Sequence, residues 1–219
     1  MTNLLKVILS GANMLRQSGD LTITMLDNVP VFADRLEQLR FSCGLASHAG
    51  AFMEFGVFEG GAINHLANNF PSRSFTGFDS FTGLPKDWVR SNESIYPKGY
   101  FSLEKLPSVA KNVTLVSVFF RQSLQPWLEH NQVEVSFVHI DCDLYSSAAD
   151  VLLYITPYLR DAAIIVFDEL CDWSDSGVYP NWPEGEWRAL CEWSNAESLI
   201  IEPISRDRLF SATIRVCKV

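Results

Sequence analysis

The chain has 219 residues, of which 47% are hydrophobic, so it can bury its own core and has the usual size of one globular domain. Its 26 acidic and 17 basic side chains give a net charge of -9, which opposes binding to the phosphates of a nucleic acid. We find neither a run of about 18 apolar residues nor a signal-peptide pattern, so we expect a soluble cytoplasmic protein without membrane contacts. The five cysteines are odd in number and form no Cys-x-x-Cys pair, which argues against a zinc cluster or a disulfide framework.

The first 50 residues are predicted to form a mostly helical cap. Between residues 31 and 45, apolar side chains recur at steps of three and four, and Pro30 suits the first position of a helix. Residues 51–219 are expected to carry the functional site, and the two parts together should form one globular domain. Acidic, aromatic-rich α/β domains of this size often self-associate, so a homo-oligomer is among the expectations.

From residue 51 onward, short apolar runs alternate with helix-compatible stretches. This alternation predicts an α/β fold with a Rossmann-like, doubly wound, mostly parallel sheet. A tryptophan-rich helix near 184–195 is followed by strands at 198–202 and 209–217, and a turn at 205–208 makes this pair a C-terminal antiparallel hairpin. The predicted parallel strands span 51–57, 74–79, 113–119, 134–140 and 162–167.

An acid and two spaced glycines end the first of these runs, in the order Glu54-x-Gly56-x-x-x-Gly60. A turn without bulky side chains lets backbone N–H groups and the start of the next helix approach a small ligand. The spacing differs from the Gly-x-Gly-x-x-Gly fingerprint of dinucleotide sites, so we expect another kind of ligand. An ordinary strand-to-helix turn of an α/β protein is an equally weighted alternative.

A long connection over residues 80–101 interrupts the regular alternation. It contains two glycines and two prolines, together with the aromatic residues Trp88, Tyr96 and Tyr100. Loops of this length inside compact domains are usually functional or disordered, and the aromatic content favours a substrate lid over a disordered linker.

Acidic residues follow three of the predicted parallel strands, whose carboxyl ends form the ligand-binding edge of such a sheet. Asp79 lies about 20 residues beyond the glycines, where an acid can bind both hydroxyls of a ribose; a turn or capping role is the alternative. Asp141, Asp168 and Glu169 would crowd one rim, which is costly without a cation. We therefore predict a divalent metal site, with Mg²⁺ preferred to Mn²⁺ or Ca²⁺, against the alternative of solvated acids that cap helices.

His139 and Asp143 are the candidates for a catalytic base. Strand alternation places His139 on the same side as Asp141 and one step deeper, where it could take a proton from a hydroxyl substrate. A buried, hydrogen-bonded histidine that supports the site is the favoured alternative. Asp143 lies where the chain turns toward the next helix, so it could instead cap that helix or hold a water.

These motifs together resemble the class I S-adenosylmethionine-dependent methyltransferases, and among them the macrocin O-methyltransferase family, which acts on sugar hydroxyls. The resemblance runs from about residue 51 to about residue 195. Four segments carry it: Glu54-Phe55-Gly56-Val57 with Gly60-Gly61, Gly77-Phe78-Asp79-Ser80-Phe81 with Gly83-Leu84-Pro85, the run from Val138 to Ser147, and the pair Asp168-Glu169.

The resemblance implies S-adenosylmethionine as cofactor, Mg²⁺ as its metal partner, a small-molecule hydroxyl as acceptor, and a methyltransferase domain over residues 51–219. It also implies a role for each matching residue. By position, Gly56 and Gly60 would flank the methionine part of the cofactor, Asp79 would hold its ribose, and Gln122 or Ser123 would border its adenine. Glu54 and Asp141 would lie among the other cofactor contacts. The metal would be held by Asp141, Asp168 and Glu169.

Two departures from the family pattern affect these expectations. Family members often have two adjacent aspartates where this chain has Asp168-Glu169, and their lid often supplies a histidine that residues 80–101 lack. The base is therefore not assigned by the resemblance. A sugar hydroxyl, a catechol-like diol and another small alcohol all suit a carboxylate-bound metal as acceptor.

Three other classes of protein are alternatives from the sequence. The Asp141-Cys142-Asp143 motif also occurs in metal-dependent glycosyltransferases that use sugar nucleotides, and in phosphatases with an aspartate nucleophile. The phosphatase motif expects Thr or Val at position 145, where this chain has Tyr145. A non-catalytic protein that keeps the fold and binds the cofactor is the third alternative.

Overall fold

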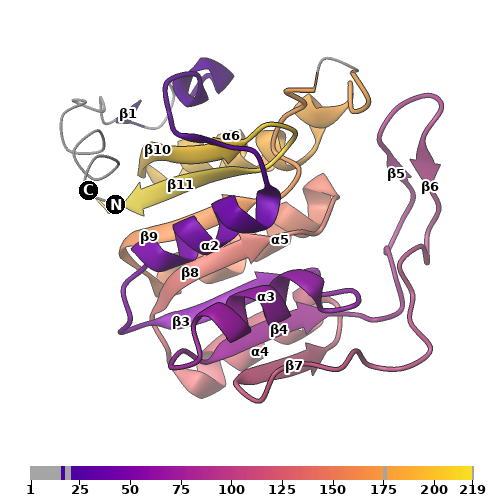
Figure 1. The fold of residues 1–219 in the computed structure, drawn as a ribbon, viewed down its shortest axis with the longest axis vertical. Helices are drawn as coiled ribbons and strands as arrows, with labels where there is room; N and C mark the ends of the chain where they lie inside the picture. The colour runs from indigo at the N-terminus through magenta and orange to yellow at the C-terminus, as the bar shows by residue number, and fades with distance from the viewer. Residues whose placement is uncertain (1–15, 18–20, 175–176, 219) are drawn as a thin grey trace.

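The computed structural model describes residues 16–17, 21–174 and 177–218. Residues 1–15 and 18–20 of the predicted helical cap lie outside these ranges. The described chain forms a nine-stranded sheet in the order β1-β10-β11-β9-β8-β3-β4-β7, with β2 beside β10 (Figure 1). Its strands are β1 (Arg16–Gln17), β2 (Val31–Phe32), β3 (Ala51–Phe55), β4 (Phe75–Asp79), β7 (Val113–Ser117), β8 (Val135–Ile140), β9 (Leu159–Phe167), β10 (Ile200–Asp207) and β11 (Ala212–Cys217).

The predicted fold class is confirmed by the pairing of these strands. Strands β7, β4, β3, β8 and β9 run parallel, and all five lie where the apolar runs predicted them. Strand β11 is antiparallel to both β9 and β10, which confirms the C-terminal hairpin. Its strands begin at Ile200 and Ala212, two or three residues later than predicted, because the turn spans 208–211.

Helices cover both faces of the sheet (Figure 1). Alternate residues of each strand point to opposite faces, so Phe52 packs with the α2 and α3 side, whereas Met53 and Phe55 pack with the α4, α5 and α6 side. The helices are α2 (Arg35–Leu45), α3 (Gly61–Asn69), α4 (Phe120–Asn131), α5 (Tyr145–Ile155) and α6 (Glu186–Glu197), with short 3-10 turns η1 (Ile23–Leu26), η2 (Thr156–Tyr158) and η3 (Trp182–Glu184). Among the described residues, no helix combines the length and apolar content needed to cross a membrane.

The start of helix α2 corrects a sequence prediction. The helix begins at Arg35 rather than after Pro30, because Asp34 adopts an extended backbone and its Oδ1 accepts the N–H of Glu37 at 2.9 Å. Residues 31–32 instead form β2, which pairs in parallel with the end of β10. The cap aspartate, not the proline, therefore marks the helix start.

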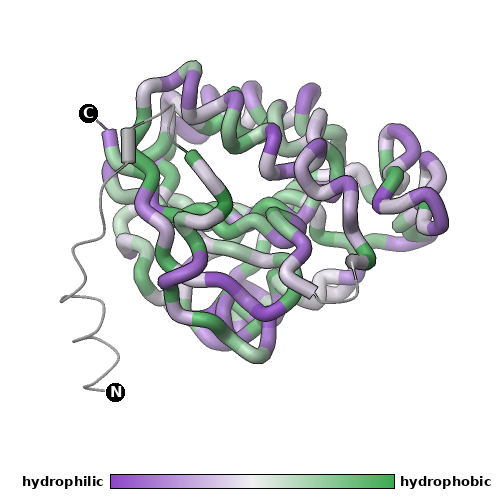
Figure 2. The backbone as a smooth tube through the Cα atoms, turned by 90° about the horizontal axis from the view of Figure 1, so that it is seen from above, coloured by the Kyte–Doolittle hydropathy of each residue, from purple (hydrophilic) through white to green (hydrophobic). Residues whose placement is uncertain are grey.

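The segment 80–101, here called the lid, projects from the carboxyl edge of the sheet in both views (Figures 1 and 2). It is not an irregular loop throughout, because β5 (Trp88–Val89) and β6 (Ile95–Tyr96) pair as a short antiparallel hairpin. Trp88 stacks on Tyr96 with ring centroids 5.0 Å apart, and Tyr96 contacts the ring of Tyr100 at 4.9 Å. The lid aromatics thus pack together, and Trp88 joins them to the body of the protein through Tyr179, whose ring centroid lies 5.7 Å away.

Candidate active site

The glycine turn, residues 56–60, joins β3 to α3 and has three residues with a positive φ, which are Gly56, Phe58 and Gly60. Gly56 has a φ of +93°, and a Cβ there would lie 1.7 Å from the backbone oxygen of Asp141. Gly60 has a φ of +81° and immediately precedes α3. Only glycine fits the first position, because the tips of β3 and β8 meet there through the bond from Asp141 N–H to Phe55 O at 2.8 Å.

Asp79, at the tip of β4, holds the other side of this turn. Its Oδ2 accepts the backbone N–H groups of Val57 and Phe58, both at 2.8 Å, and its Oδ1 accepts the N–H of Phe81 at 2.7 Å. The predicted turn chemistry is therefore present. A carboxylate has about four acceptor positions, so three backbone bonds leave capacity for a ligand hydroxyl.

A cavity of about 830 Å³ opens between the glycine turn, the strand tips and the lid. The predicted site residues divide into two groups with respect to it. Gly56, Asp79, Gln122, Asp141, Asp143 and Glu169 line the cavity, whereas Glu54, Gly60, Ser123, His139 and Asp168 do not. The lid contributes Trp88, Arg90, Tyr96, Tyr100 and Phe101 to the wall. The volume suits a small organic ligand, since such sites usually measure about 300–1,000 Å³.

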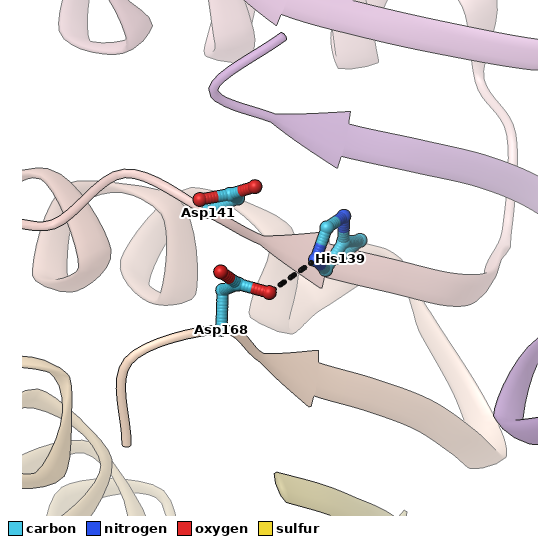
Figure 3. Close-up of side chains that lie close together, drawn as sticks. All are labelled: His139, Asp141 and Asp168. Atoms are coloured by element: carbon cyan, nitrogen blue, oxygen red, sulfur yellow. Dashed lines mark hydrogen bonds and ion pairs between the residues drawn. The ribbon is translucent and has the colours of Figure 1, made fainter. Parts of the chain in front are cut away.

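His139 lies inside the protein rather than on the cavity wall. It is fully buried, with Nδ1 3.0 Å from Glu54 Oε2 and Nε2 3.4 Å from Asp168 Oδ1 (Figure 3). Burial alone lowers the pKa of His139, but its hydrogen bonds to Asp168 and Glu54 raise that pKa to about 10. His139 does not line the cavity, so its predicted role as a base has no direct contact with the substrate space to support it. The alternative of a buried supporting histidine fits the structure.

Two of the three predicted metal ligands come together. Asp141 and Asp168 follow the neighbouring strands β8 and β9, and their carboxylates and the His139 ring offer ligand atoms within 4.8 Å of one another (Figure 3). Burial and the neighbouring Asp168 raise the pKa of Asp141. Mg²⁺ prefers oxygen ligands, and two neighbouring carboxylates can supply them. Glu169 is not in this group, because its Oε2 lies 3.2 Å from Nη2 of Arg90 on the lid.

Arg35 is a site residue that sequence reasoning missed. It is the first residue of α2, and its Nη1 lies 3.2 Å from Asp141 Oδ2 and also bonds Asp168 Oδ2. Only its position beside a helix cap was visible in the sequence, because its partners lie 106 and 133 residues away. Arg90 was missed for the same reason, although it lies within the predicted lid.

Comparison with known proteins gives the class of this molecule. Residues 53–170, more than half of the chain, match the model of a family described as a methyltransferase domain. No curated protein matches. Together with the sheet order and the glycine turn, this match defines a class I S-adenosylmethionine-dependent methyltransferase. The chain belongs to the methyltransferase-domain family.

Solved structures share the fold at low sequence identity. The calicheamicin methyltransferase CalS11 is 24% identical with a TM-score of 0.61, over 98% of this chain and 90% of that one. The O-methyltransferase NovP is 18% identical with a TM-score of 0.60, over 84% and 80%. The O-methyltransferase TomG from Streptomyces achromogenes, solved in complex with SAM, is 14% identical with a TM-score of 0.53, over 98% and 96%. At these identities the likeness concerns the fold.

Proposed function

We propose that this protein transfers the methyl group of S-adenosylmethionine to a hydroxyl of a small molecule, such as a sugar or another natural product, with the help of Mg²⁺. This places it near the macrocin O-methyltransferases that its motifs resemble. One observation carries the proposal: a single cavity joins the glycine turn and Asp79 to Asp141 and Asp143. A donor site and an acidic acceptor site therefore share one space.

The donor end of the cavity fits a nucleoside with a charged amino-acid tail. The turn at Gly56 brings backbone close to the ligand space without a side chain, and the remaining acceptor capacity of Asp79 would take a ribose hydroxyl hydrogen. Gln122 lines the expected adenine side, while Ser123 lies next to it and is buried. Glu54 does not line the cavity; its Oε2 lies 3.0 Å from Nδ1 of the buried His139. When bound, S-adenosylmethionine supplies a methyl group already activated by its sulfonium.

The acceptor end contains the carboxylates that suit a divalent ion. Asp141 and Asp168 are the residues that would hold Mg²⁺, and a bound Mg²⁺ lowers the pKa of a coordinated hydroxyl. Asp143 lines the cavity beside them, which makes it our candidate for the proton acceptor. Burial raises the pKa of Asp143 well above its usual range, and Asp141 raises it further. A carboxylate with a raised pKa is a stronger base when it is ionised, and a bound Mg²⁺ beside Asp143 would favour the ionised form.

Positioning and exclusion of water supply the rest of the catalysis. An oxygen nucleophile must lie in line with the methyl group, and the cavity walls hold the two partners in that geometry. The lid aromatics Trp88, Tyr96 and Phe101 form part of these walls, and with both substrates bound they would reduce the space left for water.

The proposal is tested first by calorimetric titration with S-adenosylhomocysteine, with sugar nucleotides as the control ligands. Methyl transfer from labelled S-adenosylmethionine is then followed on a panel of sugars, catechols and alcohols, with Mg²⁺ or with a chelator. We expect the protein to bind S-adenosylhomocysteine but not the sugar nucleotides. We also expect the Asp143→Asn variant to transfer the methyl group roughly 10²–10⁴-fold more slowly than the wild type. The matched control is Glu93→Gln, an exposed lid acid. Binding without transfer to any acceptor would instead favour a non-catalytic protein.

A further inference from the structure

We propose that Arg35 is an internal counter-cation that competes with a divalent ion for Asp141 and Asp168, so that the ion binds only when the guanidinium has left. This inference rests on the proposed metal site of the methyltransferase. It assigns to Arg35 a role as a residue that sets metal affinity, which none of the sequence motifs indicated.

The geometry places Arg35 where an ion would need to sit. Its Nη1 contacts Oδ2 of both aspartates, while the other oxygen of Asp168 faces His139. Both oxygens of Asp168 thus already have a nitrogen partner, Arg35 Nη1 on one side and His139 Nε2 on the other. An ion that approached the two Oδ2 atoms would meet the guanidinium first.

The charges lead to the same conclusion. The Arg35 guanidinium carries a permanent positive charge and contacts both Asp141 and Asp168, so part of the negative charge of this pair is already compensated. Adding a divalent ion would bring like charges to within a few ångströms in a partly buried space, where screening is weak. Removal of Arg35 leaves two neighbouring carboxylates without this cation, an arrangement that attracts a metal ion.

The backbone of Arg35 is fixed, but its side chain has room to leave. Helix α2 is anchored by a buried polar network, in which Gln38 Nε2 donates to Thr213 Oγ1 at 2.7 Å and Ser42 Oγ lies 2.6 Å from the same atom. The Arg35 side chain is 39% exposed and lines the cavity. The exchange therefore needs a side-chain rotation and no movement of the helix.

The test is the affinity for Mn²⁺, a paramagnetic substitute for Mg²⁺, measured from the loss of the free-ion resonance signal. Arg35→Met removes the charge and keeps much of the side-chain length, and Arg40→Met, on the exposed side of the same helix, is the control. We expect Arg35→Met to bind Mn²⁺ at least about tenfold more tightly than the wild type. Arg40→Met should match the wild type.

A second readout tests whether the gain arises at this site. Without metal, Arg35→Met should unfold at a lower temperature than the wild type, and Mn²⁺ should raise its midpoint more than it raises that of the wild type. Adding Asp168→Asn to Arg35→Met should abolish the gain in Mn²⁺ affinity. Persistence of the gain in this double variant would overturn the assignment to Asp168.

Equal or weaker Mn²⁺ binding by Arg35→Met would overturn the inference, as would a lack of Mn²⁺ binding by both proteins at millimolar concentration. S-adenosylhomocysteine binding and methyl transfer, measured on the same wild-type preparation, test the proposed function separately. If both of those persist while the Mn²⁺ affinities are equal, the role of Arg35 is wrong and the methyltransferase function stands.

Discussion

The Asp79 carboxylate accepts the backbone N–H of Val57 at 2.8 Å, so the tip of β4 holds the glycine turn that follows β3. Asp79→Ala removes the acceptor of three N–H groups. We expect it to lower the free energy of unfolding by about 1–3 kcal/mol and to weaken S-adenosylhomocysteine binding by tenfold or more. Urea unfolding and calorimetric titration measure the two effects. Unchanged cofactor affinity would remove Asp79 from the donor site.

A substitution at Gly56 tests whether the close approach of β3 and β8 requires a glycine. Gly56→Ala places a methyl group against the Asp141 carbonyl in a backbone conformation that alanine disfavours, so we expect a loss of more than about 2 kcal/mol in stability. Gly61→Ala is the matched control, because no described atom lies within 4 Å of its added Cβ and its residue is helical. Urea denaturation compares the two. Similar effects of both substitutions would contradict the steric argument.

Arg90 ties the lid to the body of the protein. Its Nη2 lies 3.2 Å from Glu169 Oε2, and its guanidinium lies 4.5 Å from the ring centroid of Phe210. Arg90→Ala should loosen the lid by roughly 1–2 kcal/mol, which speeds hydrogen exchange of amides in residues 84–101 several-fold. Lys98→Ala, at an exposed position of the same lid, should leave the exchange unchanged. Equal exchange in both variants would show that the pair does not hold the lid.

The buried carboxyl group of Glu186 should make the stability of the fold depend on pH. Its side chain is fully buried, its Oε2 accepts the Glu169 N–H at 3.1 Å, and its Oε1 has no partner among the described residues. Burial raises the pKa of Glu186 well above its ordinary value of 4.5. The unfolded chain loses this proton near pH 4.5 while the folded protein keeps it, so stability falls as the pH rises above that value.

The matching measurement uses Glu186→Gln, which keeps the shape of the neutral acid. We expect it to raise the free energy of unfolding by roughly 1–3 kcal/mol at pH 8, with a gain that shrinks as the pH falls toward 4.5. Glu184→Gln, at an exposed residue paired with Arg188, should show no such trend. Urea unfolding at pH 5, 6.5 and 8 provides the comparison. A gain that is equal at all three pH values would mean that Glu186 does not titrate as described.

Local pattern was sufficient to predict the five parallel strands and the C-terminal hairpin, but not β1 and β2, which lie within the predicted helical cap. The apolar runs predicted the five parallel strands, because a strand that is buried on both faces is apolar along its own length. The turn at Gly56 was visible in the sequence because a tight backbone turn accepts only certain residue types. Asp79 and Asp141 were identified because the carboxyl ends of parallel strands share one edge. The start of α2 was misplaced because Pro30 and Asp34 are both helix-start signals, and only pairing of residues 31–32 with β10 decides between them.

The partners of the charged side chains were decided by the tertiary structure alone. His139 is held by Glu54, 85 residues away, and Glu169 pairs with Arg90, 79 residues away. Arg35 reaches the acidic pair from a helix that precedes the whole sheet core. A sequence shows which acids share an edge, because strand direction fixes that. It does not show which cation approaches them, because a long side chain from any neighbouring element can satisfy the same carboxylate.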